Sequence, residues 1–376
     1  MLLLTYFYIN SNFTLPLEDS LYKNISFYAF KLLGSGKHTG QDDIRFINTS
    51  HNLALVRDTG RNTGVVAVTD RRKLAAFLEA LCQYHIHPKF IVVDLEFYYP
   101  FVAENEIQKD RSILSTDKRL QAIISKFGAL TSPVAFDEND RIKPPVVSSK
   151  QPGIASFSTY SDFLTKFQLS YKNGKFNSIP LIVYQHLSGN IIKHHGFVSI
   201  SQSKIALNNI SPYYYITDDI ARETPDFDDI AGTDQTTYSA YNDKIIFIGN
   251  FDMDKAQTAI GEMPGTVVLA NIYLTLKNGH HLVSIWWFLF MLAVFILLSY
   301  LAWFKKMPKV NLHLKIIFSE QIAKFINDYC SYFGVMLLVS VLSFLVFHIF
   351  VNILFSSLIF STIEFFTNKN YRHRHV

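Results

Sequence analysis

KFIVVDLEF, residues 89–97, contains a continuous apolar run that ends at Asp94. A run of this kind is typical of a strand that is buried on both faces in a parallel sheet. DKIIFIGNF, residues 243–251, has the same form, and its apolar run ends at Gly249. The two stretches therefore predict two central strands of one buried sheet.

Helical patterns separate the predicted strands. Thr69 or Asp70 is suited to cap a helix that begins after the apolar run at residues 65–68. The apolar face of this helix carries Leu74, Phe77, Leu78 and Leu81. Further helices are expected after residue 115 or 116 and over about residues 266–277. Strands that alternate with helices predict an α/β domain with a mostly parallel central sheet and flanking helices.

Residues 285–304 (IWWFLFMLAVFILLSYLAWF) contain no charged side chain. Their length matches the ~20 residues that a helix needs to cross a ~30 Å hydrocarbon core. Trp286 and Trp287 at one end and Trp303 at the other correspond to the two aromatic belts of a bilayer. The segment therefore predicts a transmembrane helix, with the lipid bilayer as a partner and an all-α membrane region after the α/β domain.

Basic side chains follow this helix and orient it. They are Lys305, Lys306, Lys309, Lys315 and Lys324. The positive-inside rule places this end in the cytoplasm, so the globular region lies outside. Residues 305–331 are expected to form a cytoplasmic amphipathic segment.

Residues 332–366 form a second apolar stretch, and 367–376 a basic cytoplasmic tail. As one helix, the apolar stretch would be ~52 Å long, which exceeds a ~30 Å core. We therefore expect a hairpin of two short spans that turns near residues 348–352. A single span stays the alternative, because neither Gly nor Pro lies at the proposed turn.

The first residues, 1–13, begin with the apolar stretch MLLLTYFYI, which is too short to span a bilayer. We expect them to be the remnant of an N-terminal membrane helix whose reading frame extends upstream. Residues 14–284 then form the extracytoplasmic domain. The net charge of +4 gives no reason to expect nucleic acid as a partner, and the two cysteines, Cys82 and Cys330, imply no disulfide framework.

Several of these segments resemble the second class of CHASE domain, a family of bacterial extracytoplasmic sensor domains. The most specific is DKIIFIGNFDMDKAQTAIGEMPGTVVLANIYLTLKNG, residues 243–279. VTDRRKLAAFLEAL (residues 68–81), KFIVVDLEF and residues 115–124 also resemble family segments. The resemblance implies a sensor in the bacterial inner membrane that carries transmembrane helices after its domain.

Polar side chains follow the predicted strands and form the candidate ligand site. In open α/β sheets, ligands bind beyond the carboxyl ends of the strands. The candidates are Asp70, Arg71, Asp94, Glu96, Asn250, Asp252 and Asp254. The alternative is that they act as helix caps and loop-fixing hydrogen bonds. Asn271, on an apolar helix, is expected to be a buried structural hydrogen-bonder.

No catalytic residue, metal site or cofactor is expected. Asp252 and Asp254 alone are a weak metal signal, because hard cations need about six or more oxygen ligands. We expect a sensor or binding module that is not an enzyme, recognises an unidentified extracytoplasmic signal and works through a cytoplasmic or membrane output protein. The alternatives are a structural subunit of an envelope complex and a metal-dependent, membrane-tethered transferase that uses the two aspartates.

Overall fold

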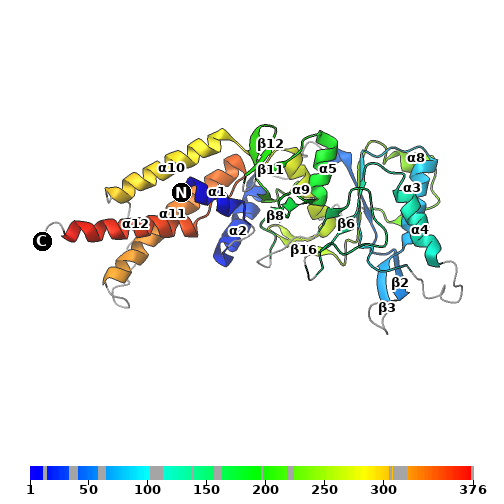
Figure 1. Cartoon of the computed structure of the whole chain (residues 1–376), viewed down its shortest axis with the longest axis horizontal. Helices are drawn as coiled ribbons and strands as arrows, with labels where there is room; N and C mark the ends of the chain where they lie inside the picture. The colour runs from blue at the N-terminus through cyan, green and yellow to red at the C-terminus, as the bar shows by residue number, and fades with distance from the viewer. Residues whose placement is uncertain are drawn as a thin grey trace.

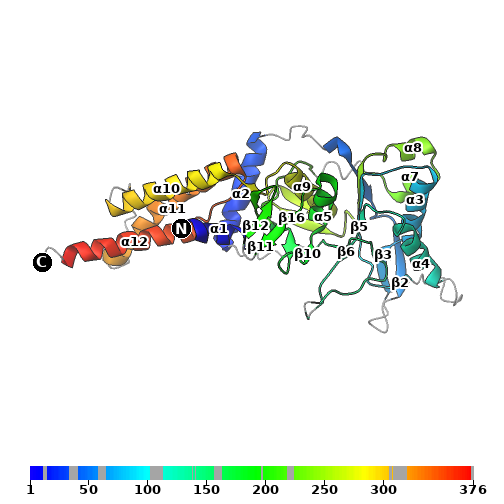
Figure 2. The same cartoon turned by 45° about the horizontal axis from the view of Figure 1, so that its top comes forward.

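The computed structural model describes most of the chain. It covers residues 1–11, 15–33, 41–57, 65–101, 113–137, 139, 141–155, 163–195, 198–217, 224–304, 307 and 320–373. The molecule is elongated, with the C-terminal helices at one end and α3, α4 and the β2–β3 hairpin at the other (Figure 1). The central sheet lies between them, with α5 and α9 on the side of the C-terminal helices, as the turned view also shows (Figure 2).

A four-stranded parallel sheet forms the centre of the domain. Its strand order is β1-β15-β4-β5, and every neighbouring pair is parallel. The bounds are Ile44–Asn48 for β1, Ile245–Gly249 for β15, Phe90–Asp94 for β4 and Leu130–Thr131 for β5. The two apolar runs of the sequence are therefore β4 and β15, adjacent in the sheet, and the predicted α/β fold with a mostly parallel sheet is confirmed.

Both faces of this sheet are buried, and its residues alternate between two hydrophobic cores. Phe90 and Val92 of β4 belong to the first core, and Ile91 and Val93 belong to the second. Helices α5 (Ile179–Ser188) and α9 (Gly265–Lys277) contribute to the first core, while α3 (Arg71–Gln83), α4 (Ile113–Ile124), α7 (Phe227–Ile230) and α8 (Gln235–Ser239) contribute to the second. This two-sided burial explains why the strands are continuous apolar runs.

Smaller antiparallel pieces complete the domain. The second sheet has the order β11-β12-β13-β18, with bounds Lys193–His195, Val198–Ser201, Lys204–Ala206 and Leu282–Val283. Its last strand, β18, directly precedes the first membrane helix. Hairpins are formed by β2 (Leu53–Arg57) with β3 (Val65–Thr69) and by β16 (Lys255–Thr258) with β17 (Gly261–Pro264). Three short strand pairs are β6 (Pro133–Val134) with β7 (Gly153–Ile154), β8 (Phe167–Gln168) with β14 (Asn209–Ile210), and β9 (Ser170–Tyr171) with β10 (Phe176–Asn177). A short 3-10 helix, η1, spans Gln41–Asp43.

Three apolar helices form the C-terminal region: α10 (Ile285–Trp303), α11 (Glu320–Phe347) and α12 (Leu354–His373). Ile285–Trp303 and Ile322–Phe347 are long and apolar enough to cross a membrane, each with a mean hydropathy of 2.3, and Leu354–Phe366 is a shorter apolar helix. The apolar stretch after residue 331 is thus divided into two helices that meet at residues 348–353.

One predicted boundary has no counterpart in the helices. No helix end separates residues 331 and 332, because α11 runs without interruption from Glu320 to Phe347. The apolar spacing simply continues across this point, and the segment contains no proline. Of the lysines used to orient the chain, Lys305, Lys306, Lys309 and Lys315 lie outside the described residues, whereas Lys324 lies on α11.

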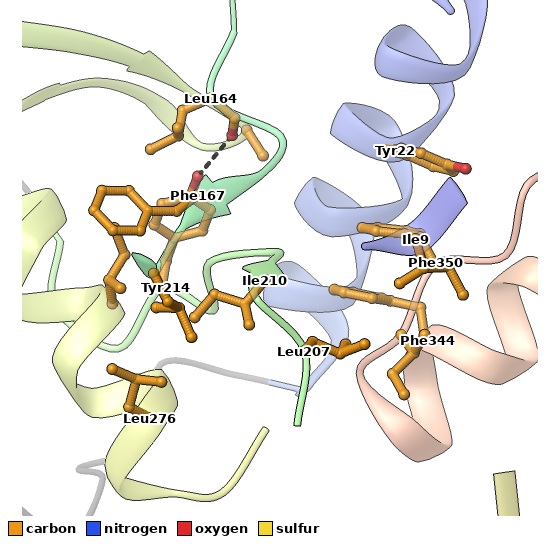
Figure 3. Packing of buried hydrophobic residues seen from close by; sticks show 14 of the residues in the cluster. Ile9, Tyr22, Leu164, Phe167, Leu207, Ile210, Tyr214, Leu276, Phe344 and Phe350 are labelled. Atoms are coloured by element: carbon orange, nitrogen blue, oxygen red, sulfur yellow. Dashed lines mark hydrogen bonds between the residues drawn. The ribbon is translucent and has the colours of Figure 1, made fainter. Parts of the chain in front are cut away.

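Two N-terminal helices, α1 (Leu2–Ile9) and α2 (Pro16–Leu33), join the domain to the turn between α11 and α12. Both oxygens of the buried Glu18 carboxyl are used: one accepts from the Tyr8 hydroxyl, and the other accepts from the backbone N–H groups of Ile353 and Leu354, each at 2.7 Å. Tyr22 stacks on Phe350 at 4.3 Å between ring centroids. The first hydrophobic core thereby continues from the sheet into the C-terminal helices (Figure 3).

Candidate functional site

Asp94 lies at the centre of the carboxyl edge of the parallel sheet. It is the last residue of β4, and its register partner on β15 is Gly249. Thr266, in the first turn of α9, donates from its Oγ1 to Asp94 Oδ2 at 2.8 Å. The end of the strand and the start of the helix therefore present one hydrogen-bonded pair at this edge.

Two glycines make room for this arrangement. A Cβ atom on Gly249 would lie 1.8 Å from Thr266 Oγ1, and a Cβ on Gly265 would lie 2.4 Å from Asp254 Oδ2. Both distances are far below van der Waals contact, so a side chain at either position would displace a polar group of the site. The Ile-Gly and Pro-Gly pairs of residues 248–249 and 264–265 thus have a direct structural purpose.

A cavity of about 570 Å³ opens at this edge. Five of the seven predicted site residues line it: Arg71, Asp94, Glu96, Asn250 and Asp254. Asp70 and Asp252 do not line it. Apolar side chains from the β2–β3 hairpin, from the segment after β4 and from α9 form much of the remaining wall, including Leu53, Val66, Val68, Leu95 and Leu269. The volume falls within the range of small-molecule sites, roughly 300–1,000 Å³.

Asp70 and Arg71 support the edge of the cavity. Asp70 caps α3 by accepting from the backbone N–H of Arg72 at 2.9 Å. The buried Arg71 guanidinium forms an ion pair with Asp117 at 2.6 Å and donates to the backbone carbonyl of Tyr99 at 2.6 Å. The charge of Arg71 is therefore matched by Asp117 on α4.

Asn250 and Asp252 form a turn. The Asn250 side-chain oxygen accepts from the backbone N–H groups of Asp252 and Met253 at 3.0 and 2.9 Å, and from the Ser50 hydroxyl at 3.1 Å. Asp252 is exposed. For Asp70, Asn250 and Asp252, the structure therefore favours the interpretation as caps and turn residues, and the expected structural role of Asn271 is confirmed by its bonds to the backbone of Tyr215 and Ile216.

The carboxyl groups of the cavity differ in their electrostatic environment. Burial, reinforced by the charges of Asp254 and Glu96, raises the pKa of Asp94 to about 7, although the Thr266 hydroxyl favours the ionised form. Surrounding protein also raises the pKa of Asp254, which lies exposed at the mouth. Because Arg71 is already paired, the cavity is acidic, and Asp94 can both accept and donate a hydrogen bond near neutral pH.

The structure adds residues that the sequence did not indicate. Thr266 was missed because a threonine in the first turn of a helix is ordinarily a structural residue. Asp117 was missed because it lies within α4 and does not follow a strand. It also accepts from the backbone N–H of Phe101 at 2.9 Å. Only the fold reveals that it lies behind Arg71.

The cavity offers little to a metal ion. Within the described parts of the chain, no three or more His, Cys, Asp or Glu side chains are grouped so that they could hold a metal. The Asp252–Asp254 pair is divided, since only Asp254 lines the cavity. The donor set therefore suits hydrogen bonding and charge recognition of an organic ligand better than metal coordination.

Comparison with known proteins gives one match. The sequence model of the CHASE2 domain matches residues 53–303, well over half of the chain, and the protein belongs to this family. CHASE2 domains are extracytoplasmic sensor domains and not catalytic ones, and α10 and α11 identify the chain as a membrane protein. No curated protein matches the chain. No solved structure matches it.

Proposed function

We propose that this CHASE2 protein is a membrane-anchored sensor in the inner membrane of a bacterium, that it binds a small ligand in the carboxyl-edge cavity, and that a partner protein reads the bound state. The observation that carries the proposal is the cavity itself, in which polar side chains at and after the ends of β4 and β15 converge beside an apolar wall. A few convergent polar groups in an otherwise apolar cavity are typical of small-molecule sites.

The ligand class follows from the charges. Asp94, Glu96 and Asp254 contribute carboxyl groups to the wall, and the only cation among the described lining residues, Arg71, is held by Asp117. An organic cation with an apolar body would complement this surface, because its ammonium group would replace the repulsion between carboxylates with attraction. We therefore propose an amine-bearing metabolite or peptide as the signal.

Calorimetry on the detergent-solubilised full chain tests this assignment. Spermidine, arginine and choline serve as cationic probes, and succinate serves as the anionic one. We expect one of the cations to bind and Asp94→Asn to weaken it roughly tenfold, as for a lost charge-assisted hydrogen bond. Glu262→Gln, which changes an exposed acid paired with Lys255, is the matched control. Equal binding in both variants would contradict the site.

The membrane topology is a second part of the proposal. An α10 that runs inward, an α11 that runs outward and an α12 that returns inward would keep the domain and the turn at residues 348–353 on the extracytoplasmic side. The bonds from Ile353 and Leu354 to Glu18 support this order, because they hold the turn against the folded domain. In a cysteine-free background, Asn190→Cys should react with an impermeant thiol reagent on spheroplasts, and Lys309→Cys should not.

A structural subunit of an envelope complex is the alternative function. The β2–β3 hairpin projects from the end of the domain opposite the membrane helices (Figure 1), and Leu55 on it is 54% exposed. An exposed apolar side chain on a projecting hairpin suits a protein contact. Retention of cation binding in Leu55→Ser, together with unchanged assembly size, would favour the sensor over the subunit.

A further inference from the structure

A second cavity lies at the opposite edge of the parallel sheet. It has a volume of about 450 Å³ and is lined by Asp43, Lys89 and Ile245, which precede or begin β1, β4 and β15. Because the three strands are parallel, these residues mark the amino edge. The C-terminal ends of α5 and α9 and Gln202, in the turn between β12 and β13, complete the wall.

Two lysines face one aspartate across this cavity. The ammonium groups of Lys89 and Lys277 each lie 3.3 Å from a different oxygen of Asp43. Although burial acts in the opposite direction, these two lysines hold the pKa of Asp43 below its ordinary value. All three side chains are partly exposed, so the group is accessible from the cavity and carries one positive charge in excess.

Neutral donors surround the two lysines. Tyr184 and Tyr273 line the cavity, and burial raises the pKa of Tyr273 to about 12, so that its hydroxyl keeps its proton. Gln202 donates its side-chain amide to the Tyr184 hydroxyl at 3.4 Å. An ammonium group has three donors, and the contact with Asp43 occupies one of them. The wall is therefore rich in donors and positive in charge.

We propose that this amino-edge cavity binds a small organic anion through Lys89 and Lys277, and that its occupancy is passed to the first membrane helix. The ligand class is a carboxylate or phosphate compound, because these groups accept charge-assisted hydrogen bonds from two ammonium groups at once. The proposal goes beyond the carboxyl-edge function and does not depend on it, since the two cavities share no lining residue.

The path to the membrane is short. Lys277, Asn278, Gly279 and Leu282 all line the cavity, and Leu282 lies on β18, three positions before the start of α10. β18 is paired with β13 through Val283 and Leu282, so it is a defined strand and not a loose linker. A ligand that draws the two lysines together therefore acts on the segment that leads directly into α10.

Binding is tested by the thermal stability of the full chain in an uncharged detergent. Sodium succinate and sodium phosphate are titrated against sodium chloride at matched ionic strength, so the two arms separate a carboxylate from a phosphate ligand. We expect a saturable stabilisation by one anion that is roughly tenfold weaker in affinity after Lys89→Gln or Lys277→Gln and absent in the double variant.

Two further variants sharpen this test. Lys255→Gln is the matched control, because Lys255 is as exposed as the two cavity lysines and forms a comparable ion pair with Glu262 at 3.7 Å. Asp43→Asn should strengthen anion binding, because it removes a carboxylate that competes for both lysines. An anion effect that is absent, that survives in the double variant, or that is weakened by Asp43→Asn would overturn the site.

Transmission to α10 has an intrinsic probe. The only three tryptophans of the chain, Trp286, Trp287 and Trp303, all lie on α10. We expect the stabilising anion to change their fluorescence spectrum in the native chain and in Lys255→Gln, but not in the double lysine variant. Saturable binding with an unchanged spectrum would overturn the transmission, and a change that persists in the double variant would overturn its assignment to this cavity.

Discussion

The two edges of the parallel sheet carry cavities of similar volume and opposite charge. At the carboxyl edge, Asp94 and Asp254 contribute acidic groups whose pKa values are raised. At the amino edge, Lys89 and Lys277 share one partly exposed aspartate. The same strands therefore present an acidic surface where they end and a basic surface where they begin.

One helix connects the two edges. Gly265 and Leu269 of α9 line the acidic cavity, whereas Tyr273 and Lys277 line the basic one. A helix of 13 residues is ~20 Å long, and its side chains are packed against the sheet along that length. α9 is therefore one packed element that contributes to the walls of both cavities.

The largest difference between the edges should appear in stability. Asp117→Ala leaves the buried Arg71 guanidinium without its ion-pair partner, and we expect a loss of about 3–5 kcal/mol in the free energy of unfolding. Lys89→Gln breaks a partly exposed pair and should cost at most about 1 kcal/mol. Chemical unfolding of the two variants measures both, and equal losses would remove the distinction.

Gly249→Ala should have the next largest effect. Its new Cβ would collide with Thr266 Oγ1 and separate this hydroxyl from Asp94, at a cost of about 1–3 kcal/mol. Gly128→Ala is the control, because no heavy atom lies within 4 Å of the corresponding Cβ. We expect Gly249→Ala to abolish ligand binding at the carboxyl edge and to preserve the anion effect at the other. Loss of both would mean that the edges are not separate sites.

The pH dependence of stability should have opposite signs at the two edges. The folded pKa of Asp94 is about 7, above its ordinary 3.8. The stability that this group contributes is therefore present below pH 4 and is lost as pH rises to 7. The folded pKa of Asp43 is lowered, so its contribution is present above pH 4 and is lost in acid.

Between pH 4 and 7, the free energy of unfolding of Asp94→Asn should therefore rise by about 1 kcal/mol relative to that of the native chain. This value is reduced for the partial exposure of Asp94. Asp43→Asn should be less stable than the native chain above pH 4, and this difference should disappear as pH falls below 4. Thermal unfolding across this range is the measurement. Parallel curves for native chain and Asp94→Asn would show that this carboxyl titrates alike in the folded and unfolded states.

The smallest expected effect is none. Changing Asp252 and Asp254 together to Asn should leave the binding of magnesium, manganese and calcium unchanged, because the two carboxyl groups do not share one site. Calorimetry on both proteins is the test. Micromolar metal affinity that disappears in the double variant would favour the transferase alternative over the sensor.

The two central strands could be predicted from the sequence because each is buried on both faces and is therefore apolar at successive positions. Such an apolar run can be recognised in β4 or β15 without knowing which strand lies beside it. Leu181, Ile182 and Val183 form an equally apolar run, yet they lie within the helix α5, since a short apolar run does not distinguish a strand from a buried helix. Helix α2 was not predicted because it is only weakly amphipathic and is held by contacts with the distant turn at residues 348–353.

The two cavities also differ in how far they could be predicted from the sequence. The carboxyl edge could be anticipated from the general position of ligands in α/β sheets, and five of its seven predicted residues line the cavity. The amino edge could not, because Asp43, Lys89 and Lys277 are far apart in the sequence and are exposed charges of an ordinary kind. Their significance comes only from the register of the strands and the end of α9.

The hydrogen bonds between Glu18 and the start of α12 also constrain how the molecule is made. Glu18 leaves the ribosome 335 positions before its partner Ile353. Until that stretch has emerged, the Glu18 carboxyl lacks the backbone N–H groups of Ile353 and Leu354. The docking of the turn at residues 348–353 onto α2 must therefore follow the synthesis of α11, and a chain arrested after α11 would leave the Glu18 carboxyl without two of its hydrogen-bond donors.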